Sequence, residues 1–116
     1  MTFSDSSPLS ISVEVGPNVA VVRLCGSVTM DQADRLNAEL RQVASAGVGR
    51  IVLDLSGLEF ICSMGLGALI VAHVITQRNK GEVVLAGARP PIVEILTTTR
   101  LDRIFPLYPD VGSAIH

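Results

Sequence analysis

The chain has 116 residues, of which 48% are hydrophobic and 17% are charged, and its formal net charge is −2. This length fits one domain, and the composition excludes the disorder that is typical of chains with few hydrophobic and many charged residues. The nine Lys and Arg residues form no basic stripe, so we expect no direct nucleic-acid partner. Aromatic residues make up 3% and Trp is absent, so aliphatic side chains must fill the interior. An aliphatic interior is typical of a parallel sheet covered by helices.

Two segments bear on where the protein resides. The first ten residues lack the basic and apolar regions of a secretory signal. The most apolar stretch, residues 66–75, is too short to cross a bilayer. We therefore expect a cytoplasmic protein that does not contact a membrane. Cys25 and Cys62 have no metal-binding spacing, so we expect two reduced thiols, no metal site and no cofactor.

The first half of the chain predicts two strands, a helix and a third strand. Residues 1–10 are polar and Ser-rich, and we predict a flexible arm ahead of a domain over residues 11–116. Alternating apolar residues predict a strand over 11–15, a turn follows at 16–18, and residues 19–24 predict a second strand that ends at Gly26-Ser27-Val28. Thr29, with Gln32 three residues later, predicts a capping box that opens a helix. The apolar stripe of this helix comprises Ala33, Leu36, Leu40, Val43 and Gly47.

The second half continues the alternation of strands and helices. Residues 51–55 predict a central strand, Ser56-Gly57 a turn, and a helix begins near Ser63 and runs to about Asn79. Residues 83–86 predict a strand, Pro90-Pro91 a helix through Leu96, residues 104–108 an edge strand, and residues 111–115 a last helical turn. The predicted fold is a single α/β domain with a mostly parallel sheet of four to five strands. Its first strand is an antiparallel edge strand, and helices cover the sheet.

The segment Phe60-Ile61-Cys62-Ser63-Met64-Gly65-Leu66-Gly67 places a hydroxyl where a strand ends and a helix begins. The N-terminus of a helix presents unpaired N–H donors and a partial positive charge, so it favours an anion. A phosphate on Ser63 would meet both. The alternative is that Ser63 only caps the helix, a position that serine occupies often.

The first turns of this helix also suggest a surface for a partner protein. Gly65 and Gly67 leave the backbone bare, which would let another chain approach closely. Apolar residues form two stripes, whereas a helix lying on one sheet needs only one. The second stripe either packs on a neighbouring helix or meets a partner, and the sequence leaves both open. The predicted partner-binding residues are Cys62, Met64, Gly65, Gly67, Ala68 and Val71.

Residues 54–58 (Asp-Leu-Ser-Gly-Leu) and 60–69 (Phe-Ile-x-Ser-x-Gly-Leu-Gly-x-Leu) resemble the signature of STAS domains, the anti-sigma factor antagonists. The resemblance extends from about residue 11 to residue 113 and is most specific around Ser63. It implies that the protein is not an enzyme. It also implies partner switching: the unphosphorylated protein binds an anti-sigma factor that is itself a serine kinase and is released when Ser63 is phosphorylated, and a serine phosphatase reverses the modification. The resemblance is equally compatible with a STAS scaffold in a stress-signalling complex, and a homodimer stays open.

The sequence departs from the family at one position, because Cys62 stands where members usually carry an Asp before the phosphorylated serine. A nucleophilic Ser63 is the enzymatic alternative. It fails because Ile61 occupies the first position of the G-x-S-x-G motif, where that motif requires glycine. We expect His73 to point away from Ser63 as an ordinary, partly buried residue.

Overall fold

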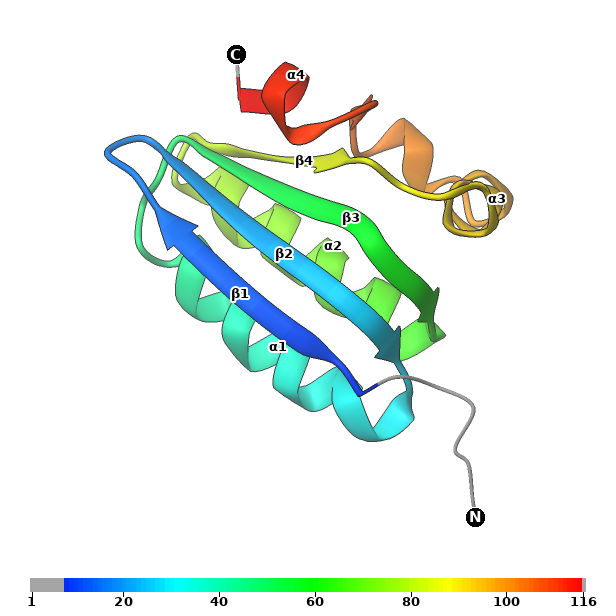
Figure 1. Ribbon diagram of the computed structural model, residues 1–116. Coiled ribbons are helices and arrows are strands. Elements are labelled where there is room, and N and C mark those ends of the chain that lie inside the picture. The colour runs from blue at the N-terminus through cyan, green and yellow to red at the C-terminus, as the bar shows by residue number, and fades with distance from the viewer. Residues whose placement is uncertain (1–7, 116) are drawn as a thin grey trace.

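Five strands and four α-helices make up the part of the chain that the computed structural model describes, residues 8–115 (Figure 1). In chain order they are β1 (Ser10–Val15), β2 (Val19–Val28), α1 (Met30–Ala44), β3 (Arg50–Ile61), α2 (Ser63–Arg78), β4 (Glu82–Ala86), α3 (Pro90–Thr98), a 3₁₀ turn (Leu101–Arg103), β5 (Leu107–Tyr108) and α4 (Val111–Ile115). Within this part of the chain, no helix is long and apolar enough to span a bilayer.

The strands form one sheet in the order β1-β2-β3-β4-β5. β1 pairs with β2 antiparallel, and every other neighbouring pair is parallel. The predicted mixed sheet with an antiparallel edge strand is therefore confirmed. The short β5 forms the opposite edge, but only Leu107–Tyr108 of the strand predicted over 104–108 pairs with β4, and Pro106 lies just before it.

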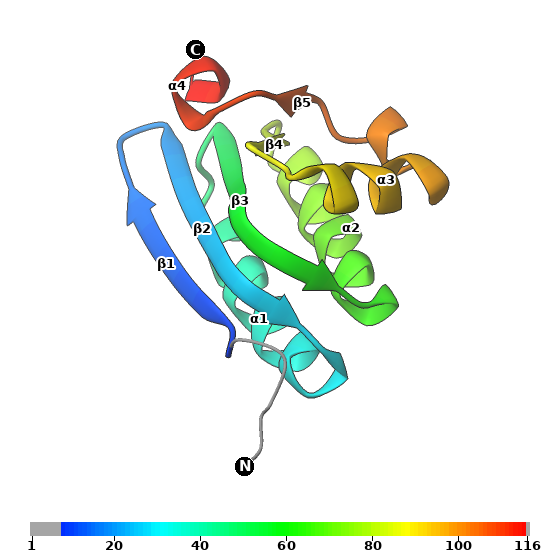
Figure 2. The same cartoon turned by 45° about the vertical axis from the view of Figure 1, so that its right-hand side comes forward.

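The two faces of the sheet are covered unequally (Figure 2). α1 and α2 lie side by side on one face, and the main core fills the space between them and the sheet. Its strand residues alternate along β2, β3 and β4, as in Ala20, Val22 and Leu24. The small α4 packs on the opposite face, where Ala114 contacts a second cluster that includes Val21, Val52 and Val84.

β2 and β3 are both longer than predicted. Gly26-Ser27-Val28 continues β2 instead of ending it, and Ser56-Gly57 lies inside β3 instead of forming a turn. The pairing of the two strands accommodates these residues by shifting its register between Arg23 and Cys25 and again between Gly26 and Ser27. A bulge-like irregularity of this kind bends a strand without ending it. Both strands consequently reach the start of the following helix.

The start and end of α1 also differ from expectation. Thr29 occupies the N-cap position, but its side chain makes no capping hydrogen bond within the described chain and instead donates its hydroxyl hydrogen to Asp31. The predicted capping box with Gln32 is wrong, because the Thr29 hydroxyl is taken by the nearer carboxylate. Gly47 lies beyond the helix, exposed and with φ of +80°, rather than on its apolar stripe.

The packed domain begins earlier than the predicted boundary at residue 11. Leu9 is buried in the main core, and its carbonyl accepts a hydrogen bond of 2.7 Å from Arg35 Nη1. Ser10 is the first residue of β1. Leu9 and Ser10 therefore do not belong to a flexible arm, and residues 1–7 of the predicted arm lie outside the described residues.

Candidate functional site

A single residue, Cys62, connects β3 to α2. Its N–H donates to the Val28 carbonyl at 2.9 Å, which ties the connection to the end of β2. Its backbone is extended (φ −81°, ψ 172°), and its carbonyl accepts the first hydrogen bond of the helix, from the Leu66 N–H at 3.0 Å. Ser63 is thus the first helical residue, and its side chain is exposed.

The N-terminus of α2 carries no side-chain cap within residues 8–115. Cys62 occupies the N-cap position and makes no capping hydrogen bond, and the first turn contains no acidic residue. The alternative prediction that Ser63 merely caps the helix is therefore wrong, because the cap position belongs to Cys62. The first-turn amides and the positive end of the helix dipole are left beside an exposed hydroxyl, an arrangement suited to a negatively charged group on Ser63.

Exposed apolar side chains lie at the same end of the sheet as Ser63. β2 and β3 are parallel, and Ser27 pairs with Phe60 where they end, so α1 and α2 begin next to each other (Figures 1 and 2). Met30, Phe60 and Met64 are 62%, 46% and 51% exposed. Sequence reasoning did not single out Met30 and Phe60, which lie exposed at this end of the sheet. The pairing of parallel strand ends was the signal that could have found them.

Four of the six predicted partner residues line a groove between α1 and α2. Met64, Gly67 and Val71 come from α2, and Ala33, Asp34, Asn37 and Arg41 come from α1. Ala68 also borders this groove but is buried. Leu66 and Leu69, on the stripe that the sequence left open, are buried in the main core and do not face this groove. The contribution of α1 to the groove was not predicted.

Gly65 does not face a partner, contrary to the prediction. It is buried, and a Cβ on it would lie 2.7 Å from Val28 Cγ1 and 2.8 Å from Ile61 Cγ1. Gly65 therefore lets the first turn of α2 approach the ends of β2 and β3. A Cβ on Gly67, by contrast, would have no described atom within 4 Å beyond its chain neighbours and its own helix backbone. Of the two glycines, only Gly67 leaves the helix surface open.

Comparison with known proteins supplies the family. The sequence model of the STAS domain matches residues 10–114. The chain belongs to the STAS domain family. An anti-sigma F factor antagonist from Paenibacillus polymyxa is 27% identical over 108 residues, which cover 92% of each chain. The crystal structure of an anti-sigma factor antagonist from Mycobacterium paratuberculosis has a TM-score of 0.84 and 30% identity, and the match covers 93% of this chain and 92% of that one. Unphosphorylated SpoIIAA, at 19% identity, has the same fold, with a TM-score of 0.77 and coverage of 91% of this chain and 93% of its own.

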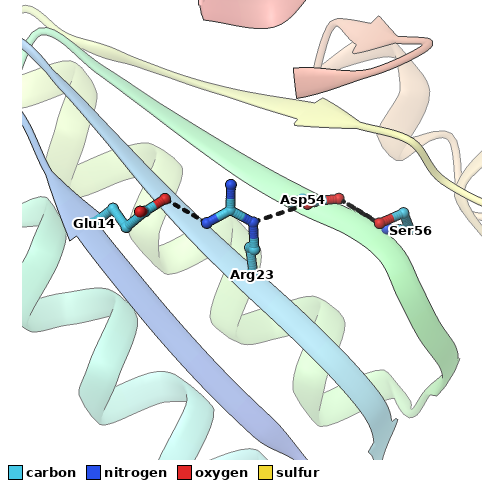
Figure 3. Close-up of polar contacts among 4 residues, drawn as sticks. All are labelled: Glu14, Arg23, Asp54 and Ser56. Carbon is cyan, nitrogen blue, oxygen red and sulfur yellow. Dashed lines mark hydrogen bonds and ion pairs between the residues drawn. The ribbon is translucent and has the colours of Figure 1, made fainter. Parts of the chain in front are cut away.

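Asp54 and Ser56, in the first part of the STAS signature, make polar contacts on the face of the sheet opposite α1 and α2 (Figure 3). Asp54 accepts hydrogen bonds from the Ser56 hydroxyl at 2.8 Å and the Ser56 N–H at 3.1 Å, and its other oxygen lies 3.4 Å from Arg23 Nε. Arg23 also pairs with Glu14, whose hydrogen bond and then charge raise the pKa of the guanidinium. This chain of contacts links β1, β2 and β3 just before the register shift. A Cβ on Gly57 would lie 2.6 Å from Cys25 Sγ, so the signature glycine permits the close strand contact that follows.

His73 lies in the STAS domain away from Ser63. Its ring meets that of Phe105 edge to face, with centroids 5.4 Å apart and an interplanar angle of 71°. The residue is partly buried, as predicted. Among the described residues, no group of three or more His, Cys, Asp or Glu side chains gathers as a metal-ligand set, and Cys25 and Cys62 are both free thiols.

Proposed function

We propose that this STAS protein is an anti-sigma factor antagonist whose switch is phosphorylation of Ser63. The unphosphorylated form binds an anti-sigma factor that has serine kinase activity, and phosphorylation of Ser63 by that partner releases it. A serine phosphatase removes the phosphate and restores binding. The protein is the substrate and ligand in this cycle and catalyses none of its steps.

One observation carries the proposal: the exposed Ser63 hydroxyl stands at an uncapped helix N-terminus next to exposed apolar side chains. Met30, Phe60 and Met64 provide the apolar surface that a partner can bury. Buried apolar anchors supply most of the free energy of a typical interface. A kinase bound there would have the hydroxyl within its interface, where it can be phosphorylated.

The physical chemistry of phosphoserine gives the direction of the switch. A phosphate adds a charge of about −1.5 to −2 at neutral pH. At the first residue of α2 that charge is favourable to the helix, so the domain should stay folded. In a complex the same dianion would have to lose its water against an apolar surface. The penalty therefore falls on the interface, and binding weakens.

Cys62 in place of the family's usual Asp is compatible with this scheme. A carboxylate at the N-cap would occupy first-turn amides and repel a phosphate on the next residue. Cys62 makes no capping hydrogen bond within the described chain, so those amides stay available to the phosphate. The relatives named as anti-sigma factor antagonists support the choice of partner class.

The test uses three substitutions at Ser63. Tagged Ser63→Ala protein, which cannot be phosphorylated there, is used to isolate the partner from the source cells, and mass spectrometry identifies it. Binding of the purified partner is then titrated against Ser63→Asn and Ser63→Asp, which have similar volumes and differ in charge.

We expect a single partner with a kinase domain. The dissociation constant of its complex with Ser63→Asp should be at least about tenfold higher than with Ser63→Asn, a loss of ~1.4 kcal/mol in binding free energy. Equal affinity of the two variants would refute the charge switch. Recovery of a large assembly without a kinase would favour the scaffold role instead.

A further inference from the structure

The outer edge of β1 has no strand beside it in the described part of the chain. β1 is the first strand of the sheet, and within residues 8–115 it pairs only with β2 (Figure 1). Its backbone groups on the other side therefore face away from the described sheet. Ile11, Val13 and Val15 point to the helix-covered face, and Val13 and Val15 remain 37% and 64% exposed.

This edge lacks most of the features that usually prevent strands from associating. Soluble proteins protect an open edge with charged side chains, lysine above all, or with proline, a bulge or a very short strand. The charged residue of β1, Glu14, is paired with Arg23 of the neighbouring strand. β1 has six residues, Ser-Ile-Ser-Val-Glu-Val, with neither Lys nor Pro. Its pairing with β2 runs without a register shift from Ser10 to Val15. The strand thus presents a regular edge to an incoming strand.

We propose that β1 pairs antiparallel with β1 of a second copy of this chain, on a two-fold axis that passes through Val13. This surface is separate from the Ser63 site and goes beyond the proposed function. Residues directly opposite in an antiparallel pair share a face of the sheet. An axis at Val13 satisfies this condition, because Val13 then faces Val13 and Ile11 faces Val15 of the second copy.

The same register separates the charges on the other face. Glu14 of each copy lies opposite Ser12 of the other, so the two carboxylates are not direct neighbours. Each Glu14 is also paired with Arg23 of its own chain. Like charges placed directly opposite would destabilise a strand pair, and this register avoids them.

The helix layer is self-complementary about the same axis. Arg35 of α1 bonds to Leu9 ahead of β1, whereas Glu39, Gln42 and Ala46 border a hollow beside Val13 and Val15. α1 therefore runs along β1 with Val13 near the level of Glu39 and Gln42. The two-fold axis brings Glu39 to the level of Gln42 of the second copy, so the two Glu39 carboxylates do not face each other. A six-residue strand and one helix flank form a small interface, and we expect a weak, concentration-dependent dimer.

α2 and Ser63 remain accessible in this dimer. α2 contacts β4 in the half of the sheet away from β1, and it begins at Ser63, just beyond the carboxyl end of β3 (Figure 2). The dimer therefore does not cover the α2 surface. Its formation and the binding of a partner at Ser63 are tested independently.

The first test is sedimentation equilibrium of the full chain over a range of concentrations. Wild type should dimerise, and Val13→Lys, which places two ammonium groups on the axis, should raise the dissociation constant at least about tenfold. Val74→Lys is the matched control, because Val74 is 39% exposed on α2 and lies off the edge. It should dimerise as wild type does. A wild-type monomer at every concentration, or a dimer that survives Val13→Lys, would overturn the proposal.

A disulfide scan tests the register and does not depend on the fold of the lysine variant. Val13→Cys places two thiols opposite each other, about 5 Å apart at Cβ, close enough to be joined after small adjustment. Val15→Cys is the control, because its sulfur faces Ile11 of the second copy and is about 14 Å along the strand from its counterpart. Under mild oxidation Val13→Cys should form a covalent dimer, whereas Val15→Cys and wild type should not. Preferential crosslinking of Val15→Cys would refute the axis at Val13.

Discussion

Gly65 and Gly67 differ in a way that a pair of alanine substitutions can measure. Both lie early in α2, so each substitution gains a similar helix-propensity term of up to about 1 kcal/mol. Only at Gly65 does the added methyl meet neighbouring atoms, at 2.7 Å from Val28 Cγ1 and 2.8 Å from Ile61 Cγ1. At Gly67 the added methyl would meet no described atom within 4 Å other than those of its chain neighbours and its own helix backbone.

The expected cost at Gly65 follows from what the methyl would touch. Val28 and Ile61 are buried and β-branched, so neither side chain can move aside freely. Overpacking of this kind costs about 1–3 kcal/mol. Because the propensity terms nearly cancel between the two variants, Gly65→Ala should be less stable than Gly67→Ala by the steric term, ~1–3 kcal/mol. Gly67→Ala should itself equal or exceed the wild-type stability.

The assay is equilibrium urea unfolding of wild type and both variants, followed by circular dichroism. A difference of 2 kcal/mol corresponds to a shift in midpoint of about 1 M when the slope is ~2 kcal/mol/M. Equal midpoints for the two alanine variants would show that α2 does not pack against β2 and β3 through Gly65. The account of the site's geometry would then be wrong.

Three further substitutions probe the site and its surroundings. Cys62→Asp should cap α2 and raise the free energy of unfolding by about 1 kcal/mol in urea titrations at neutral pH, and no gain there would mean that the first-turn amides are already satisfied. Asp54→Ala removes the acceptor for Ser56 and the partner of Arg23, so the free energy of unfolding should fall by about 1–3 kcal/mol, whereas an unchanged value would show that this polar chain is dispensable. The Ser113 N–H, 2.7 Å from Asp110 Oδ1, and the Ser113 side chain lower the Asp110 pKa, so its carboxyl midpoint in an NMR titration should lie below the ordinary value of about 3.9. Because folding lowers that pKa, the carboxylate contributes to folding stability above the pKa of the unfolded chain, and this contribution is lost as pH falls through the pKa of the folded protein. Asp110→Asn should remove this part of the loss of stability in acid. An Asp110 midpoint at the ordinary value would contradict the assignment.

The strand and helix order was predictable because each element carries its own pattern. Alternation in β1 and the short apolar runs of β3 and β4 are local signals, as are the prolines that open α3. The full length of β2 and β3 was not predictable from local signals. Ser56-Gly57 has the residue types of a turn, but pairing with β2 and the two register shifts keep it in a strand. A contact between strands that are distant in sequence decided that outcome.

The candidate site likewise has one feature that local sequence signals predict and others that depend on contacts between distant segments. Ser63 at the start of α2 follows from the boundary between strand and helix, which the sequence marks clearly. The roles of Gly65 and Gly67 do not follow, because they depend on which side of the first turn faces Val28 and Ile61. The groove residues Asp34 and Arg41 were equally out of reach, since they belong to a helix that only the parallel crossover brings beside α2.

Phosphorylation of Ser63 in the cell tests the central proposal most directly. The native protein should be isolated from its source cells during growth and under stress, and the peptide that contains Ser63 quantified by mass spectrometry in phosphorylated and unphosphorylated form. We predict phosphate on Ser63 with an occupancy that changes between conditions. Complete coverage of the peptide without phosphate in any condition would contradict the switch and leave the protein as a STAS binding module without regulation at this serine.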